Sequence, residues 1–318
     1  MGLTSLRSLT RDVERFLEYK RALGHPYGRG AYTLRSLFRH AQTLARRSDR
    51  VDFEAALRSW LARGPGRKPV SVTVDLGAVR QFCLFRRRSD PQAFVPDRMW
   101  APQSTESHFL PHVLSVDDVR HVLDLTRTVR HPLRGCMLHT LLLVLYCTGL
   151  RPGEAVRLTL ADLDLTDRVL TIRESKGKTR IVPFGDDLAE VIKRYLRVRP
   201  STDPSSRSGP LFTRPDGSAV PINVASCGIQ RLFRRAGLKP PKGRIGPRPY
   251  DLRHTFAVHR LTAWYREGVD IHARLSWLSA YMGHNDLLGT EAYLTATPEL
   301  LALAASRFER RCRGESPV

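Results

Sequence analysis

The chain of 318 residues is longer than a typical single domain, so two domains are expected. It carries 52 basic and 31 acidic residues, which gives a formal net charge of +21. Residues 1–112 hold 20 of the basic and 10 of the acidic residues, so about half of the excess lies in each part of the chain. This distribution excludes a basic tail, and it favours a protein whose two parts both face a polyanion.

A membrane partner is not expected. The longest apolar run, residues 141–146, is much shorter than the roughly 20 residues that span a bilayer. The first residues include Arg7, Arg11 and Asp12, and they lack the uninterrupted apolar segment of a secretory signal. We therefore expect a cytoplasmic protein that binds nucleic acid.

The five cysteines do not form a recognisable metal site. None belongs to a Cys-x-x-Cys pair and no histidine cluster accompanies them, so neither zinc nor another cofactor is expected. An odd number without paired spacing is typical of a reducing compartment. Small buried side chains are expected at all of these positions: Cys83, Cys136, Cys147, Cys227 and Cys312.

Residues 3–100 are predicted to form a small helical domain. Apolar residues at helical spacing begin after the polar start at Thr10 and recur over 13–23, 34–45, 53–61 and 76–85. The basic segment 63–69, rich in Gly and Pro, is predicted to be a turn. The proline-containing stretch 91–114 lacks periodicity, and an interdomain linker is expected within it, at residues 101–112.

The second part, residues 113–318, is predicted to be mainly helical with a small antiparallel β-sheet. Ser115 with Asp118 three positions later begins a helix, and Gly149 ends a buried one. Alternating residues on both sides of 175–178 predict a β-hairpin. The other expected elements are a second short hairpin over 212–220 and helices over 133–148, 152–158, 187–196 and after 223, interrupted at 239–248.

Several short motifs follow one another in this second part. They are Thr148-Gly149-Leu150-Arg151-x-x-Glu154, Lys176 in the hairpin, Asp251-Leu252-Arg253-His254-Thr255-Phe256-Ala257, and Gly283-His284 with Tyr293 nine residues after the histidine. Their order and spacing over roughly 113–300 resemble the tyrosine recombinases, the phage integrase family. The resemblance implies a catalytic domain at 113–318 and an all-α, SAM-like core-binding domain at 1–100. Together these domains would close as a clamp around duplex DNA.

The resemblance also implies the roles of the site residues. Arg151 and Arg253 would hold the two non-bridging oxygens of a phosphodiester under attack, because planar guanidinium groups bind such oxygens in pairs. Tyr293 would attack the phosphorus and keep the DNA as a 3′-phosphotyrosyl link, so that strands rejoin without ATP. Glu154, one helical turn after Arg151, is expected to orient a neighbour rather than contact DNA.

Lys176 is the expected general acid, which would protonate the departing 5′ oxygen from the tip of the hairpin. Lys178 is the alternative, but the family position directly precedes Gly177 and so favours Lys176. His284 would donate to a non-bridging oxygen or share in proton transfer with the nucleophile.

Tyr250 departs from the family pattern, which usually has histidine three residues before the second arginine. A phenol with a pKa near ~10 is no base at neutral pH, although it can donate a hydrogen bond to a phosphate oxygen. The proton acceptor is therefore left open. His254, one turn later, usually has a structural place in the motif, and a direct role for it is the lesser alternative.

These residues together predict a site-specific recombinase or integrase that acts on double-stranded DNA as a tetramer. Accessory recombination proteins and an origin in a mobile element are compatible with the resemblance. No carboxylate cluster suggests a catalytic metal. The helix expected over 298–308 would pack on its own domain or on a neighbouring protomer.

Two other functions are compatible with parts of the same sequence pattern. A type IB topoisomerase-like enzyme would use the same chemistry as a monomer to relax supercoils. A catalytically silent DNA-binding regulator would bind without cleaving, with Tyr250 as a sign of decay. The presence of the other catalytic residues argues against such decay: Arg151, Lys176, Arg253, His284 and Tyr293.

Overall fold

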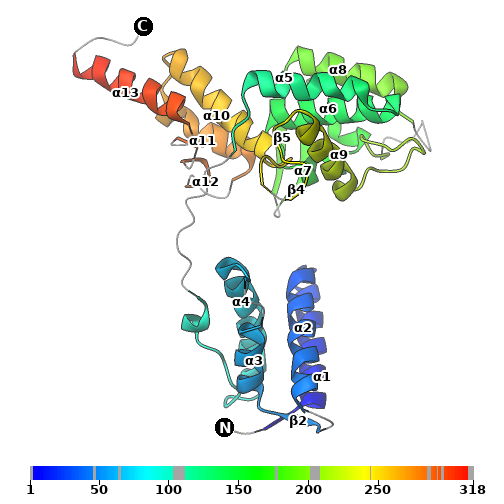
Figure 1. Cartoon of the computed structure of the whole chain (residues 1–318), viewed down its shortest axis with the longest axis vertical. Helices are drawn as coiled ribbons and strands as arrows, with labels where there is room; N and C mark the ends of the chain where they lie inside the picture. Colours follow the sequence, from blue (N-terminus) through cyan, green and yellow to red (C-terminus); the bar gives the residue numbers. More distant parts are fainter. Residues whose placement is uncertain are drawn as a thin grey trace. The chain divides into compact units, whose positions relative to one another are not determined.

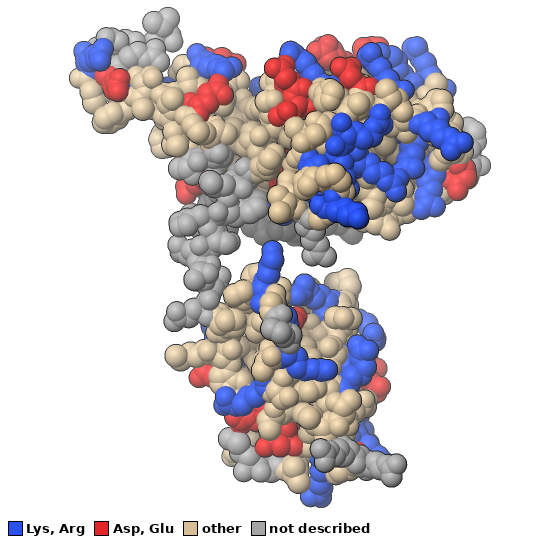
Figure 2. All heavy atoms as spheres, in the orientation of Figure 1, with Lys and Arg blue, Asp and Glu red and all other residues tan. Residues whose placement is uncertain are grey.

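The chain divides into two compact units, Met1–His108 and Phe109–Val318 (Figure 1). The computed structural model describes residues 3–45, 48–63, 66–102, 112–175, 178–200, 208–243, 245–284, 288–291, 293–294 and 297–313. Within these ranges, every helix is too short or too polar to cross a bilayer. Figure 2 shows Lys and Arg side chains on the visible surface of both units, so the positive charge is not confined to one of them.

The N-terminal unit is built mainly from helices. They are α1 (Leu6–Ala22), α2 (Gly28–Ala45), α3 (Phe53–Leu61) and α4 (Pro69–Arg86). The two-residue strands β1 (Thr4–Ser5) and β2 (Arg50–Val51) pair antiparallel, so the expected all-α architecture needs this correction. The core contains apolar side chains from each of these helices, among them Phe16, Leu37, Phe38, Leu57, Phe82 and Cys83.

Two helices of this unit begin earlier than predicted. The side chain of Ser5 accepts from the backbone N–H of Ser8 and caps α1, so this helix includes residues before Thr10. Pro69 begins α4, well before residue 76, because proline at a first helical position lacks an N–H that would need a partner. The predicted turn at 63–69 is correspondingly shorter.

The first part of the proline-containing stretch belongs to the N-terminal unit. Phe94, Val95, Trp100 and Ala101 pack against its core. The guanidinium carbon of Arg58 lies 3.8 Å from the centre of the Trp100 ring. The beginning of the expected linker is therefore a packed segment rather than a free spacer.

The second unit combines helices with a small antiparallel sheet. The strands β3 (Leu163–Asp164), β4 (Val169–Ser175) and β5 (Lys178–Pro183) pair in the order β3-β4-β5. The predicted first hairpin is therefore present. The second, over 212–220, is present only as an isolated antiparallel bridge between Thr213 and Ala219, without assigned strands.

The helices of this unit surround α6 and extend to the C-terminal side. They are α5 (Val116–Leu125), α6 (Pro132–Thr148), α7 (Pro152–Arg157), α8 (Asp186–Val198), α9 (Ile222–Arg235), α10 (Asp251–Arg266), α11 (Ile271–Met282), α12 (Leu288–Glu291) and α13 (Pro298–Cys312). The expected mainly helical fold with a small antiparallel sheet is confirmed.

The C-terminal end of α6 sets the direction of the chain that leads to Arg151. Its side chains are apolar on most faces, and most of those between Gly135 and Thr148 are buried. Gly149 ends it with φ +62°, a left-handed conformation that suits glycine. A Cβ at Gly149 would lie 2.4 Å from Cδ1 of Phe256, so α10 also approaches too closely for any larger residue.

A separate apolar cluster joins α10, α11 and α13 and includes Tyr293. In Figure 1, α13 lies along α10, where Leu300 is fully buried. The Arg307 guanidinium donates to the carbonyl of Gly268 over 3.0 Å. In this structure, α13 therefore packs on its own chain, the first of the two arrangements considered from the sequence.

The prediction that all cysteines are buried was wrong. Cys83 is buried and Cys136 partly buried, whereas Cys147, Cys227 and Cys312 are exposed. All five are free thiols.

Candidate active site

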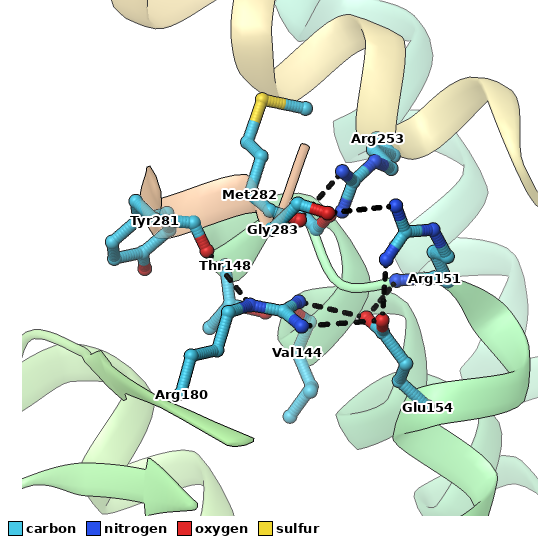
Figure 3. Close-up of polar contacts among 10 residues, drawn as sticks. Val144, Thr148, Arg151, Glu154, Arg180, Arg253, Tyr281, Met282 and Gly283 are labelled. Atoms are coloured by element: carbon cyan, nitrogen blue, oxygen red, sulfur yellow. Dashed lines mark hydrogen bonds and ion pairs between the residues drawn. The ribbon is translucent and has the colours of Figure 1, made fainter. Parts of the chain in front are cut away.

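The C-terminal end of α11 is the point at which the arginines of the site meet (Figure 3). The last carbonyls of a helix lack partners within it and carry the negative end of its dipole. Here a different guanidinium donates to each of them: Arg180 to Tyr281 over 2.9 Å, Arg253 to Met282 over 2.6 Å, and Arg151 to Gly283 over 3.0 Å. The helix end therefore sets the relative positions of these cations.

Arg151 precedes the first turn of α7. Glu154 accepts from the backbone N–H of Arg151 over 2.9 Å and from its Nη1 over 2.7 Å. The carboxylate therefore fixes both the backbone and the guanidinium of the arginine.

Arg180 was not among the residues that the sequence singled out. Its Nη1 and Nη2 donate to the two carboxylate oxygens of Glu154, over 3.2 and 2.8 Å. The signal that could have found it is strand alternation: on β5, Val182 is fully buried and Ile181 is 63% exposed. Arg180 shares the inward side with Val182, where an arginine needs charged or polar partners.

Arg253 is completely buried at the start of α10. Besides its bond to Met282, it donates from Nη1 to the carbonyl of Gly149 over 2.7 Å. Burial, followed by the nearby charge of Arg151, lowers the pKa of Arg253 to about 10. The guanidinium therefore remains a cation at neutral pH, held between the end of α6 and the end of α11.

Tyr293 lies in the same region with only 4% of its surface exposed. Its hydroxyl is 3.0 Å from Nδ1 of His254. Burial raises the pKa of Tyr293 to about 12, while the positive charges of Arg253 and Arg151 act in the opposite direction. The phenol is thus within the electrostatic reach of both arginines.

His284 follows the glycine that ends α11. Gly283 has φ +69°, the left-handed conformation that commonly ends a helix. Nδ1 of His284 is 2.6 Å from Oγ1 of Thr290, and its ring stacks on the Tyr293 ring with 6.2 Å between centres. The histidine is therefore adjacent to the phenol, as the motif spacing predicted.

Tyr250 is 38% exposed and contacts the His254 ring edge-on, with 5.1 Å between ring centres. It borders a cleft of about 470 Å³ that is also lined by Arg151, Arg157 and Arg248. Glu154, which holds Arg151, also lines this cleft, and the phenol donor with the three arginines suits an anionic group. Lys176 lies outside the described residues.

Comparison with known proteins agrees with this geometry. Residues 112–299 match the profile described as the phage integrase family. A protein of Sinorhizobium fredii, y4rE, which is named as an integrase or recombinase, is 32% identical over 95% of this chain and 96% of its own length. The chain belongs to the phage integrase family. It is accordingly an enzyme of the recombinase and integrase class.

Two further proteins have lower sequence identity to this chain. The tyrosine recombinase XerD of Staphylococcus epidermidis is 27% identical over 77% of this chain and 78% of its own. The Tn1549 transposon integrase, solved in complex with transposon right end DNA, has a TM-score of 0.66 at 16% identity and covers 96% of this chain and 99% of its own. At that identity the likeness shows the fold alone.

The structure brings most of the predicted site residues together. Arg151, Arg253 and His284 meet at the end of α11, and Tyr293 contacts both histidines of the site. Tyr250 lies at the edge, with the His254 ring between it and Tyr293.

Proposed function

We propose that this chain is a site-specific recombinase that cleaves and rejoins DNA strands through a 3′-phosphotyrosyl intermediate. The single observation that carries the proposal is that Arg151 and Arg253 donate to neighbouring carbonyls at the end of α11, while the Tyr293 hydroxyl lies 3.0 Å from Nδ1 of the residue after Arg253. Family membership supports recombination as the activity. The geometry supports Tyr293 as the nucleophile.

The arginines suit the charge that develops during attack. A phosphodiester under attack by the phenol gains negative charge on its two non-bridging oxygens, which fixed guanidinium groups stabilise without reorganisation. Glu154 and the carbonyls of α11 hold these groups in place before DNA arrives. Preorganisation of this kind lowers the barrier more than mobile surface arginines would.

The remaining residues have separate roles in the proposal. Lys176 protonates the departing 5′ oxygen, with Lys178 as the alternative. His284 donates to a non-bridging oxygen, and its bond to Thr290 orients the ring for this role. Tyr250, at the edge of the arginine-lined cleft, donates a hydrogen bond to a phosphate oxygen of the DNA.

DNA is the proposed partner of both units. The N-terminal unit acts as a SAM-like core-binding domain. Two features support this role: the unit is mainly helical, and residues 1–112 carry ten more basic than acidic residues. Phosphate contacts then dominate affinity, which should fall steeply with salt. Exchange between two duplexes requires four active sites, so a tetramer on DNA is part of the proposal, together with an origin in a mobile element and with accessory recombination proteins.

The test begins with a DNA site. Repeated binding selection from random duplexes supplies a selected duplex, which is then prepared with a nick beside the cleavage position so that the released 5′ end diffuses away. We expect this duplex to form an adduct that resists detergent, with or without EDTA. Tyr293→Phe should bind the selected duplex normally and form no adduct.

Tyr265→Phe is the matched control, because this half-buried tyrosine packs against the same apolar cluster away from the site. An adduct that persists in Tyr293→Phe would overturn the nucleophile assignment. Binding without any adduct would favour the silent regulator. Relaxation of supercoiled plasmid that lacks the selected sequence would favour a type IB topoisomerase-like enzyme.

A further inference from the structure

We propose that His254 is the proton acceptor for Tyr293, in place of the histidine that the family usually has at position 250. This inference rests on the proposed function, since it concerns how the same nucleophile is activated. The bond between the Tyr293 hydroxyl and Nδ1 of His254, 3.0 Å long and buried, is the observation that carries it. His254 thus touches a reacting atom directly.

The surroundings of the ring suit proton acceptance. Nε2 of His254 lies 3.8 Å from Oδ1 of Asp251, which is too long for a hydrogen bond but close enough for electrostatic stabilisation of an imidazolium. With the proton on Nε2, the lone pair of Nδ1 is directed at the phenol. Asp251, His254 and Tyr293 are thus arranged as carboxylate, base and nucleophile.

The charge state of the free ring is consistent with this role. Burial lowers the pKa of His254, the Asp251 carboxylate raises it, and the cations of Arg248 and Arg253 lower it further. His254 is therefore neutral at neutral pH and able to take a proton. The titratable and charged groups that the structure places around the ring are Arg248, Tyr250, Asp251, Arg253 and Tyr293.

The neighbouring groups fit the role less well. Tyr250 is a phenol, and its described contact with His254 is between rings. Arg253 is a cation at neutral pH. His284 meets Tyr293 by ring stacking, and its Nδ1 is bonded to Thr290. Among these groups, His254 combines a neutral ring with a direct contact to the phenol oxygen.

The Tyr293 oxygen forms a bond to phosphorus while its proton moves to Nδ1 of His254. The bond between phosphorus and the 5′ oxygen breaks, and that oxygen takes a proton from the Lys176 ammonium to become a hydroxyl. Rejoining reverses each transfer: the 5′ hydroxyl returns its proton to Lys176, and His254 returns its proton to the phenol.

His254→Asn provides the direct test, because the amide oxygen takes the place of Nδ1 and accepts a hydrogen bond but not a proton. On the nicked selected duplex, single-turnover cleavage should fall by about 10²- to 10⁴-fold, the usual contribution of a general base, while DNA affinity stays the same. His259→Asn is the matched control. His259 lies on the same helix and its Nδ1 is 2.9 Å from the Tyr146 hydroxyl, away from the site.

The pH profile separates a base from a structural residue. In the unsubstituted chain, cleavage should fall as pH falls through the His254 pKa, because the ring must be neutral to act. In His254→Asn this limb should disappear, and the rate should keep rising toward the phenol pKa. The His254 pKa measured by NMR in the unsubstituted chain should coincide with the limb, a comparison that holds even where the variant is unstable.

A substrate with sulfur at the 5′ bridging position separates the base from the acid. Sulfur leaves without a proton, so the loss in Lys176→Ala should shrink on this DNA, while the loss in His254→Asn should remain. Cleavage by His254→Asn within about threefold of the unsubstituted chain, or restoration by sulfur, would overturn the inference. Absence of any adduct in the unsubstituted chain would instead count against the proposed function itself.

Discussion

Arg180 donates to both carboxylate oxygens of Glu154, over 3.2 and 2.8 Å, from a strand that the motifs do not include. The same carboxylate holds Arg151, and Arg180 also holds the carbonyl of Tyr281. Glu154 is almost fully buried, so its charge depends on both arginines for compensation. Arg180 thus links β5 to α7 and to the end of α11.

Arg180→Ala should therefore weaken both stability and catalysis. Removal of one partner of a buried ion pair costs about 3–5 kcal/mol of the free energy of unfolding. Cleavage should fall by roughly 10²-fold, because Arg151 and the end of α11 lose a support that positions them. Urea unfolding and single-turnover cleavage measure the two effects. Arg120→Ala, which breaks an exposed pair with Asp117, should cost at most about 1 kcal/mol.

A methylphosphonate at the cleavage position tests how Arg180 acts. This group lacks one charged non-bridging oxygen, so it depends less on precise placement of the guanidinium groups. The defect of Arg180→Ala should be smaller on this DNA than on the natural phosphate. Equal defects on both substrates would show that Arg180 supports the fold without acting through Arg151.

Gly283→Ala should destabilise the chain by more than backbone strain alone. The left-handed conformation costs a non-glycine residue about 1–2 kcal/mol. In addition, a Cβ at Gly283 would lie 2.8 Å from Nη1 of Arg180. Gly237→Ala measures the strain alone, because Gly237 has φ +75° and a Cβ there would meet nothing within 4 Å.

A double-mutant cycle identifies the source of the extra cost. In an Arg180→Ala background, Gly283→Ala should cost no more than Gly237→Ala, because the clashing side chain is gone. Strictly additive losses in urea unfolding would contradict this explanation.

The raised pKa of Tyr293 predicts a dependence of stability on alkaline pH. Its folded value is about 12, against an unfolded value near ~10, so the fold favours the neutral phenol. The resulting stability is fully present below the unfolded pKa and is lost as pH rises toward the folded one. Tyr293→Phe should lose less stability than the unsubstituted chain between about pH 10 and 12. Parallel losses in urea unfolding would show that the phenol is not buried in solution.

The two hairpin lysines can be distinguished by the leaving group. Lys176→Ala should lose cleavage by about 10²- to 10⁴-fold on ordinary DNA, and a 5′ bridging sulfur should restore most of it. Lys178→Ala should cleave at close to the unsubstituted rate on both substrates. The opposite pattern in single-turnover assays would assign the general acid to Lys178.

Spacing and periodicity predicted those parts of the molecule that depend on local sequence. Gly149 and the Ser115 capping box lie where helix-ending and helix-starting signals placed them. The β1–β2 pair could not be predicted, since two-residue strands carry no measurable alternation and depend on contacts distant in sequence.

The site residues divide in the same way, into those that a local sequence pattern predicts and those that depend on contacts across the fold. Arg151, Arg253, His284 and Tyr293 could be predicted as site residues because their spacing is characteristic. The roles of Arg180 and His254 depend on which atoms meet across the fold: Arg180 contacts Glu154, 26 positions away, and His254 contacts Tyr293, 39 positions away. Neither contact leaves a local pattern in the sequence.

The most direct test of the central claim is to identify the residue joined to DNA. The adduct formed on the nicked selected duplex would be digested with protease and nuclease, and the modified peptide sequenced by mass spectrometry. The account predicts a nucleotide linked through its 3′ phosphate to the oxygen of Tyr293. A link to another residue, or a 5′ phosphate at Tyr293, would contradict it.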